Sequence, residues 1–516
     1  MWIRPITIND FKGWLNLSTT SDIADNEFQI AKNVFYNQKG QIQTRYGYRK
    51  FGNAVGSNKP ITSYFFYQRD DTLATTALCV SGTNMYKYDE WTGNWSSIKS
   101  GLTEFETAIP SHRTRWDFAV YKNIIYMCNG VDDYASYDGA TYTTYGAQPN
   151  VRYITYIGDR MFAAGDDTTP STLYYTGAAP ANANTINTNV LIVGGDELGR
   201  INGLNELGNI ILALKSGKIY SIDVTNQRAE PIDAQTGWFS DRSIANVANS
   251  LVYLTDRWVD TLRPRQWVAW ASSLESQPLD ANVRELTSRI IESQLNANCA
   301  WYIKKLNNYY ISITTNGSNI PDSTLVYNSL VNAWTQYSYP WLYDFGVYID
   351  TDWVYHYLFA SSTTDQIYEM ENWFDDDGTP IPVEIKSKDF DFGEPWQFKT
   401  YSYVDITWQK SRFSTIYLTI EVDWEVVGGG QISDDNITST TVVETLGSRP
   451  LGIDTLTGTA SDEIELFPFI VRVPLYATGN TINFGMSSES GVWILQKVRM
   501  WVNAEPIDVF GYENII

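Results

Sequence analysis

The chain has 516 residues, a length typical of about three domains, and 15% of its residues are aromatic. It contains 35 Gly and 18 Pro, an ordinary share that excludes collagen-like and low-complexity chains. The formal net charge of −22 disfavours nonspecific adhesion to nucleic acid or to an anionic membrane, because proteins that bind these surfaces concentrate Lys and Arg.

The cysteines and the hydropathy pattern indicate a soluble protein made in a cytoplasm. Cys79, Cys128 and Cys299 are too widely spaced for a disulfide framework or a CxxC metal pair, so we expect buried reduced thiols. The first residues, MWIRPITINDFKGW, lack the apolar core of a signal peptide. No stretch approaches the roughly 18 to 20 apolar residues that span a bilayer, and we expect no membrane-spanning segment.

The first segment, residues 1–54, is predicted to be an N-terminal arm that closes the following domain. A short helix is expected from Asp25 through Phe28 to Val34. A second helix is expected after Asp280, where Val283, Leu286 and Ile290 form one apolar stripe. Elsewhere apolar and polar residues alternate with period two, which indicates an all-β protein.

Residues 55–375 repeat a block of strand, turn, strand, turn and Tyr-bearing strand. Tyr88, Tyr137, Tyr175 and Tyr220 follow one another at intervals of 49, 38 and 45 residues. In two blocks a Trp follows a Tyr by seven residues and precedes a hydroxyl residue, as in Tyr88 with Trp95 and Tyr327 with Trp334. Periods of this length with several strands are typical of propeller blades. We therefore predict a multi-bladed β-propeller of six or seven blades.

The acidic turn WFDDDGTPIP (373–382) ends these repeats, and residues 376–516 are predicted to form an antiparallel β-sandwich. In residues 416–424, Ile416, Leu418, Ile420, Val422 and Trp424 share one face, as a half-buried strand requires. Residues 428–466 form an insertion with seven acidic residues against Arg449 alone. Such long loops are either functional or disordered. If functional, its channel, gate or docking residues are Asp434, Asp435, Asp462, Glu463 and Glu465.

Catalytic motifs are missing from the sequence. GxSxG, HExxH and GxxxxGK[ST] do not occur, and His356, one of two histidines, stands in a strand pattern. The turn DEWTGNW (89–95) lacks the residue order of a sialidase Asp box. A glycosidase pair drawn from Asp350, Asp352, Asp375, Asp376 and Asp377 stays open, since two placed acids suffice. We predict a protein that is not an enzyme, with no cofactor and no metal.

Two regions resemble a known family. In the first, GWLNLSTTSDIADNEFQIAKNVFYNQKGQIQTRYGYRKFG (13–52), the motif is Asp25-Asn26, then Ala31 to Val34, Gly40 and Arg45 to Tyr48. In the second, Tyr327-Asn328 and Trp334 precede IYEMENWFDDDGTPIPVEIKSKDFDFGEP, where the DDGTPI turn leads into Phe390 to Gly393. Both are similar to the β-propeller tail nozzle proteins, the tail tubular protein B family, of short-tailed bacteriophages.

This resemblance implies a structural protein of the virion tail, assembled in the cytoplasm of a bacterial host. It implies a homohexameric ring below the portal and adaptor (the head–tail connector), with tail fibres or spikes as further partners. DNA would pass through the lumen without sequence-specific binding, helped by the acidic surface during genome retention and ejection. The alternative is a glycan-directed propeller of a phage tail, either a receptor-binding lectin or a capsule depolymerase.

Overall fold

We describe the protein from a computed structural model. It describes residues 4–9, 11–14, 23–37, 39–105, 115–195, 199–208, 210–215, 217–232, 240–255, 258–264, 274–290, 292–315, 318, 320–339, 342–410, 415–432, 442–444 and 467–504. The chain forms two compact units. Unit 1 comprises Met1–Gly47, Leu330–Tyr337 and Trp373–Ile516, and unit 2 comprises Tyr48–Ser329 and Ser338–Asn372.

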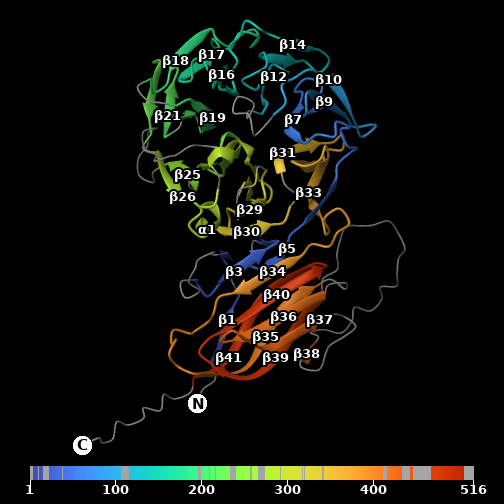
Figure 1. Cartoon of the computed structure of the whole chain (residues 1–516), viewed down its shortest axis with the longest axis vertical. Coiled ribbons are helices and arrows are strands. Elements are labelled where there is room, and N and C mark those ends of the chain that lie inside the picture. Colours follow the sequence, from blue (N-terminus) through green and yellow to red (C-terminus); the bar gives the residue numbers. More distant parts are fainter. Residues whose placement is uncertain are drawn as a thin grey trace, which may run out of the picture. The chain divides into compact units, whose positions relative to one another are not determined.

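Unit 2 is a β-propeller in which seven sheets can be followed among the described residues (Figure 1). Blades 1 to 5 are four-stranded antiparallel sheets with their strands in chain order. Blade 1 has β7 (Ile61–Gln68), β8 (Thr75–Ser81), β9 (Asn84–Asp89) and β10 (Asn94–Lys99). Blade 2 has β11 (Asp117–Tyr121), β12 (Ile124–Cys128), β13 (Ala135–Tyr137) and β14 (Tyr142–Thr144). Blade 3 has β15 (Tyr153–Ile157), β16 (Arg160–Ala164), β17 (Thr172–Tyr175) and β18 (Asn189–Ile192).

The remaining blades complete the ring. Blade 4 has β19 (Ile201–Leu207), β20 (Ile210–Lys215), β21 (Lys218–Asp223) and β22 (Arg228–Pro231). Blade 5 has β23 (Ala245–Val247), β24 (Ser250–Leu254), β25 (Val259–Pro264) and β26 (Leu274–Pro278), and the short 3₁₀ helix η3 (Asp241–Ser243) precedes it. Blade 6 contributes β27 (Cys299–Ile303), β28 (Asn308–Ile313) and β29 (Ser323–Asn328) to this unit. Blade 7 has β31 (Leu342–Ile349), β32 (Tyr355–Ser361) and β33 (Ile367–Trp373), and its fourth strand is β6 (Gly47–Lys50).

The blades begin with tight hairpins whose turns follow from the sequence. In blade 2, Lys122 and Asn123 connect Tyr121 to its partner Ile124, and both turn residues have positive φ, 49° and 63°. Such two-residue turns match the twist of the flanking strands. The Tyr and Trp of the repeated spacing, Tyr88 and Trp95, face each other in β9 and β10. Tyr327 and Trp334 lie in β29 and β30 (Ala333–Tyr337), again two consecutive strands.

The propeller closes where blade 7 meets blade 1. The backbone N–H of Tyr64 donates to Asp344 Oδ2 at 2.8 Å, and the Tyr64 hydroxyl donates to the Val347 carbonyl at 3.1 Å. Gly346 lies under the Tyr64 ring, where a Cβ would stand 2.1 Å from a ring carbon. The joint also contains a buried cluster with Phe51, Trp95 and Tyr348. A glycine is therefore required at position 346 for the two blades to pack this closely.

Unit 1 is a sandwich of two sheets. The first contains β1 (Arg4–Ile8), β4 (Val34–Tyr36), β5 (Ile42–Thr44), β35 (Lys399–Lys410), β38 (Val442–Glu444), β39 (Phe467–Gly479) and β41 (Trp493–Ala504). The second contains β2 (Gly13–Trp14), β3 (Glu27–Lys32), β30, β34 (Val383–Ser387), β36 (Thr415–Val422), β37 (Glu425–Ile432) and β40 (Ile482–Ser490). Strands β36 and β37 contact β39, so the sheets pack across a common core.

The strand pattern of residues 416–424 is confirmed except at its end. Ile416, Leu418, Ile420 and Val422 are all buried. The sequence placed Trp424 on the same face, but its side chain is 76% exposed. Strand β36 ends at Val422, and the next two residues turn the chain with φ of 46° and 76°. Alternation between the two faces holds only within a strand, so it does not predict the orientation of Trp424, which lies in the turn after β36.

Two helix predictions need correction. The segment from Asp25 to Val34 was expected to contain a helix, but Glu27–Lys32 is strand β3, paired antiparallel with β34. The helix after Asp280 is one turn, α1 (Arg284–Thr287), followed by the 3₁₀ helix η5 (Glu292–Ala297). The apolar stripe expected for this helix is only partly buried: Val283 and Ile290 are buried, and Leu286 is half-buried. These are short connecting turns in an otherwise all-β fold.

The predicted N-terminal arm, 1–54, does not correspond to a unit of its own. Residues up to Gly47 group with the sandwich, and the residues from Tyr48 on group with the propeller. Trp373, within the acidic turn expected to end the repeats, begins the last segment of unit 1. The sandwich is thus built from both ends of the chain.

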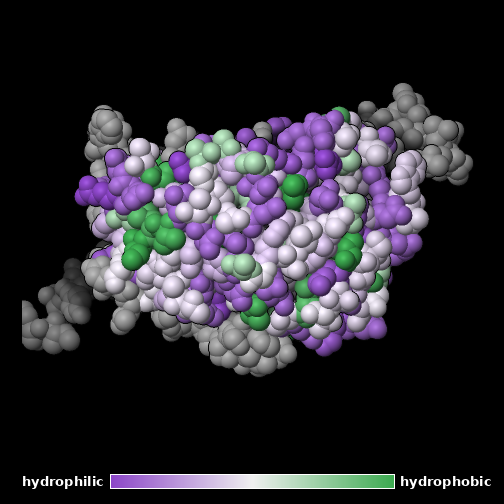
Figure 2. Space-filling view, turned by 90° about the horizontal axis from the view of Figure 1, so that it is seen from above, coloured by the Kyte–Doolittle hydropathy of each residue, from purple (hydrophilic) through white to green (hydrophobic). Residues whose placement is uncertain are grey.

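The surface is mainly hydrophilic on the face drawn in Figure 2, where hydrophobic residues form small separate groups. Among the described residues, no helix is long and apolar enough to cross a membrane.

Candidate functional site

The five acidic residues singled out in the insertion 428–466 cannot be placed. Asp434, Asp435, Asp462, Glu463 and Glu465 lie outside the described residues. Their role as channel, gate or docking residues stays a prediction, and the described part of the chain has to supply the candidate site.

The carboxylates considered for glycoside hydrolysis separate into two groups. Asp350 and Asp352 belong to unit 2, whereas Asp375, Asp376 and Asp377 belong to unit 1. Asp350 Oδ1 accepts from the backbone N–H groups of Asp352 and Val354, at 2.9 and 2.8 Å. Burial opposes ionisation of this carboxyl, but these backbone N–H groups and His356 outweigh it and lower its pKa. A general acid requires a raised pKa, so Asp350 is unsuited to that role.

Asp376 forms a buried ion pair with Arg45. The guanidinium donates Nη1 to Asp376 Oδ1 at 2.9 Å and Nη2 to Oδ2 at 2.6 Å. Its Nε donates to Asn33 Oδ1 at 2.9 Å, and Asn33 Nδ2 donates to the Pro382 carbonyl. The Arg45 side chain is fully buried. We call Asn33, Arg45, Asp376 and Pro382 the motif node, because each comes from a motif that carries the family resemblance.

His356 lies between two carboxylates in blade 7. Its Nδ1 is 2.9 Å from Glu369 Oε1, and its Nε2 is 3.1 Å from Asp350 Oδ2. The hydrogen bond to Glu369 has the largest effect and raises the pKa of His356. The hydrogen bond to Asp350 adds to this rise, whereas burial opposes it. Both ring nitrogens are thus engaged with carboxylates, and no nucleophile contacts them through any hydrogen bond found for this side chain. The expected strand-face position is confirmed, because His356 lies in β32 opposite Tyr348.

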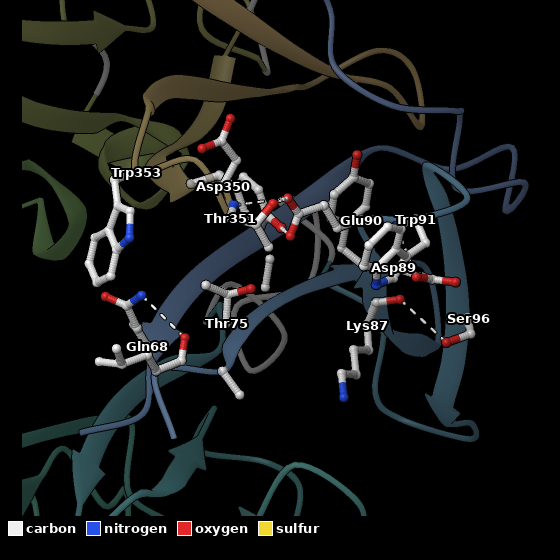
Figure 3. A pocket seen from close by; sticks show the side chains of 15 residues that line it. Gln68, Thr75, Lys87, Asp89, Glu90, Trp91, Ser96, Asp350, Thr351 and Trp353 are labelled. Carbon is white, nitrogen blue, oxygen red and sulfur yellow. Dashed lines mark hydrogen bonds between the residues drawn. The ribbon is translucent and has the colours of Figure 1, made fainter. Parts of the chain in front are cut away.

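A groove of about 710 Å³ lies where blade 1 meets blade 7 (Figure 3). Three hairpin turns border it: β7 to β8, β9 to β10, and β31 to β32. Each turn contributes one exposed large hydrophobic side chain to the lining of the groove, namely Leu73 (53% exposed), Trp91 (93%) and Trp353 (56%). In Figure 3, Trp353 and Gln68 stand at one end of the groove, and Trp91 with Asp89 stands at the other. We call this feature the turn groove.

The carboxylates of the turn groove are held in place by neighbouring donors. Glu90 Oε2 accepts from the Tyr348 hydroxyl at 2.8 Å, and Glu90 Oε1 accepts from both the N–H and the hydroxyl of Thr351 at 3.0 Å. Asp89 accepts from the Trp91 N–H at 3.1 Å and from the Thr92 hydroxyl at 2.9 Å. Each acid therefore fixes a turn or joins the two blades. The groove is therefore lined by carboxylates in fixed positions.

A second, smaller cavity of about 330 Å³ lies among the innermost strands of the propeller. Its charges are mixed: Arg115, Arg152, Arg242, Asp117, Asp241 and Asp344. Burial raises the pKa of Asp117 and of Asp344. Asp117 Oδ2 accepts from the Ile154 N–H at 2.9 Å, so it ties blade 2 to blade 3. This centre joins the blades, and its volume of about 330 Å³ is at the lower end of the range for small-molecule sites, far below that of a channel for duplex DNA.

Metal and thiol chemistry find no support in the described residues. They contain no group of three or more His, Cys, Asp or Glu side chains that could hold a metal ion. Cys79, Cys128 and Cys299 are free and buried, and burial raises the pKa of all three thiols. A thiol with a raised pKa is a poor nucleophile.

Sequence reasoning missed the turn groove. Trp91 lies in DEWTGNW, a turn that approaches a sialidase Asp box without its residue order, and Trp353 follows the acidic residues Asp350 and Asp352. The sequence does contain a signal for this groove, namely a Trp inside a polar turn. Such a Trp is unusual, because turn residues are normally small and polar.

Comparisons with known proteins add little. No protein family and no curated protein matches the sequence. Among solved structures, YCF48 bound to a D1 peptide is 9% identical, with 62% of this chain and 94% of that chain covered and a TM-score of 0.39. The computationally designed Ika8 protein is 11% identical, with 63% and 99% covered and a TM-score of 0.38.

Proposed function

We propose that the protein is a structural component of a phage virion, a tail nozzle or tail hub whose ring encloses the DNA path below the portal and adaptor. The observation that carries this proposal is the motif node. Asn33 and Arg45 belong to one of the two regions that carry the resemblance and Asp376 to the other, and Arg45 and Asp376 are 331 residues apart in the sequence. They meet in one buried hydrogen-bonded cluster. This convergence supports the proposal, because the separate regions that carry the resemblance build one buried feature.

The conduit must lie between copies of the chain. The cavity at the propeller centre is too small for a duplex, so a DNA path requires a ring of subunits. A closed ring uses heterologous interfaces that repeat around an axis. The net charge of −22 fits a lumen along which DNA slides, because an acidic wall releases no counterions from the phosphates and gains no adhesion. A homohexamer is the ring that the family resemblance implies.

The test is the assembly state of the purified chain. Mass photometry of the protein, alone and with the portal and adaptor proteins of the same phage, should show a ring of six subunits. Negative-stain images should show a central opening in end-on views. A chain that stays monomeric in both mixtures would contradict the proposal. Asp376→Asn, which breaks the motif node, should reduce ring assembly, whereas Asp71→Asn at an exposed ion pair should leave it unchanged.

The alternative of a glycan-directed propeller divides into two activities. A depolymerase needs a carboxyl group with a raised pKa near a second acid. The turn groove offers instead Asp350 with a lowered pKa and Glu90 already accepting three hydrogen bonds. The lectin form of the alternative does not need such an acid.

A further inference from the structure

Three exposed hydrophobic side chains border the turn groove, and two of them have unusual backbone conformations. Trp353 has φ of 63° and Leu73 has φ of 58°. Positive φ is uncommon in residues other than glycine and favours Asn and Asp among them. A Trp and a Leu that are more than half exposed gain little from burial at these sites. The fold therefore holds apolar groups toward solvent at a local cost, which is typical of residues that bind something.

The groove also offers polar groups beside these side chains. The Gln68 amide lies near Trp353, and its Nε2 donates to the Leu73 carbonyl at 3.2 Å. Lys87 also lines the groove, and its Nζ donates to the Gly139 carbonyl of blade 2 at 3.0 Å. Carboxylates accept several hydrogen bonds at once, so Glu90 and Asp89 can accept more from a ligand. These polar groups are already ordered, and ordered groups lose little entropy on binding.

We propose that the turn groove binds a neutral oligosaccharide. A sugar ring has apolar C–H faces, which fit the flat indoles of Trp91 and Trp353, and a rim of hydroxyl groups. The rim hydroxyls donate to Asp89 and Glu90 and exchange hydrogen bonds with the Gln68 amide. The volume of about 710 Å³ lies within the range of small-molecule sites and leaves room for more than one sugar ring. Trp353 and Trp91 stand at opposite ends of the groove, so a chain of sugars can lie between the two indoles (Figure 3).

Charge selects among glycans. Asp89, Glu90 and Asp350 face the groove against Lys87 alone. Uronic-acid and sialic-acid polymers would be repelled by this excess of carboxylates, whereas uncharged hexose and N-acetylhexosamine chains would not. Cleavage is not part of the proposal, because the pKa of Asp350 is lowered and Glu90 already accepts three hydrogen bonds from Tyr348 and Thr351. The groove holds the glycan without changing it.

This inference stands apart from the conduit proposal. Glycan binding requires only the two blades that form the groove, whereas the conduit requires a ring of subunits. A monomeric chain that binds sugars would overturn the conduit and keep the groove. A ring that binds none would do the reverse.

The experiment uses the full-length protein on an array of neutral and anionic glycans, followed by calorimetric titration with maltohexaose, cellohexaose, N-acetylchitohexaose and any array ligand. We expect saturable binding of at least one neutral glycan and none of polygalacturonate or polysialic acid. Trp91→Ala and Trp353→Ala should each raise the Kd at least about ten-fold. Both side chains are exposed, so circular dichroism and the melting temperature should stay at wild-type values.

The matched control is Trp396→Ala in unit 1, a Trp that is 92% exposed and lies outside the groove. It should bind the glycan as the wild type does. The proposal is overturned if no neutral glycan binds, if anionic glycans bind preferentially, or if the three Trp variants lose affinity equally. It is also overturned if the groove variants weaken only the association with the adaptor protein, because the groove would then be a protein interface.

Discussion

Arg45 and Asp376 illustrate how single residues stabilise this fold. Their side chains are almost completely removed from solvent and joined by two hydrogen bonds in parallel. Taking both charges out of water is costly, and the pair contributes little net stability compared with apolar residues of the same volume. Removing one partner is different, because the other charge is left buried and uncompensated.

Replacing Asp376 by Asn should therefore destabilise the protein by about 3–5 kcal/mol. Chemical unfolding followed by Trp fluorescence measures the change. Asp71→Asn is the control, because Asp71 pairs with Arg69 at 2.9 Å while its side chain is 50% exposed. Exposed pairs contribute at most about 1 kcal/mol. Equal losses for the two variants would show that the Arg45 pair is not effectively buried.

Asp260 should make the stability of blade 5 depend on pH. Its side chain is buried and accepts a hydrogen bond from Trp258 Nε1 at 2.9 Å. Burial, helped by the nearby Asp280, raises the pKa of Asp260 to about 7. The folded protein thus keeps this proton where the unfolded chain, with a pKa near 4, has lost it. Its contribution to stability is complete below about pH 4 and is lost as the pH rises through 7.

Asp260→Asn removes this ionisation and keeps an oxygen for Trp258. Between pH 5 and pH 8 the variant should gain about 2 kcal/mol in unfolding free energy relative to the wild type. Melting temperatures measured from pH 4 to pH 8 test the prediction, since the two curves should diverge steadily as the pH rises from about 4 to 7 and run parallel above pH 7. Parallel curves would mean that Asp260 is ionised in the folded protein throughout.

The sequence predicts such residue-scale features unevenly. The buried thiols and the alternation of Ile416, Leu418, Ile420 and Val422 follow directly from residue type and spacing. The partner of Arg45 does not, because Asp376 is one of three successive aspartates and nothing local distinguishes it. The insertion residues Asp434, Asp435, Asp462, Glu463 and Glu465 could be proposed as a site from charge alone, and charge does not place them.

Among the elements, the joint between blade 1 and blade 7 is the place where the propeller ring closes. Gly346→Ala introduces a Cβ about 2.1 Å from the Tyr64 ring, so β31 and β7 must move apart. Overpacking of this kind costs about 1–3 kcal/mol. Gly177→Ala is the matched control, because a Cβ at Gly177 meets nothing within 4 Å and its φ is not positive. Thermal unfolding should show a loss for Gly346→Ala alone, and a neutral Gly346→Ala would mean that the joint is loosely packed.

Element type was predictable where turn chemistry and periodicity agree, and failed where they conflict. The blades have both signals, as at Lys122 and Asn123, and the propeller was predicted correctly. The stretch from Asp25 to Val34 has a plausible helix start, but strand β3 pairs with β34 about 350 residues away in the sequence, and this long-range pairing overrides the local preference. The turn groove could not be predicted from the sequence for a related reason, because its walls come from the first and the last blade, which are far apart in the chain.

At the scale of the whole molecule, the N-terminal segment connects the two units in sequence. Its first 47 residues supply strands to both sheets of the sandwich, and β6 completes blade 7. The sequence predicted a propeller and a sandwich in this order but treated residues 1–54 as a separate arm. Alternation shows that a strand exists and which face is buried, but it does not tell which distant strand lies beside it.

The acidic insertion provides the last test of the conduit. If its carboxylates face the DNA path, they repel a duplex that carries one charge per roughly 1.7 Å, and ejection proceeds without adhesion. Replacing Asp434, Asp435, Asp462 and Glu463 by Lys should slow genome ejection in low salt and less so in high salt, where screening weakens the attraction. Ejection rates of assembled particles at several ionic strengths measure this.

The control variant replaces four exposed acidic residues of the propeller by Lys, which gives the same change in net charge. They are Asp70, Asp133, Asp159 and Glu230. Equal slowing by both variants would assign the effect to overall charge, and wild-type ejection at every ionic strength would exclude the insertion from the DNA path.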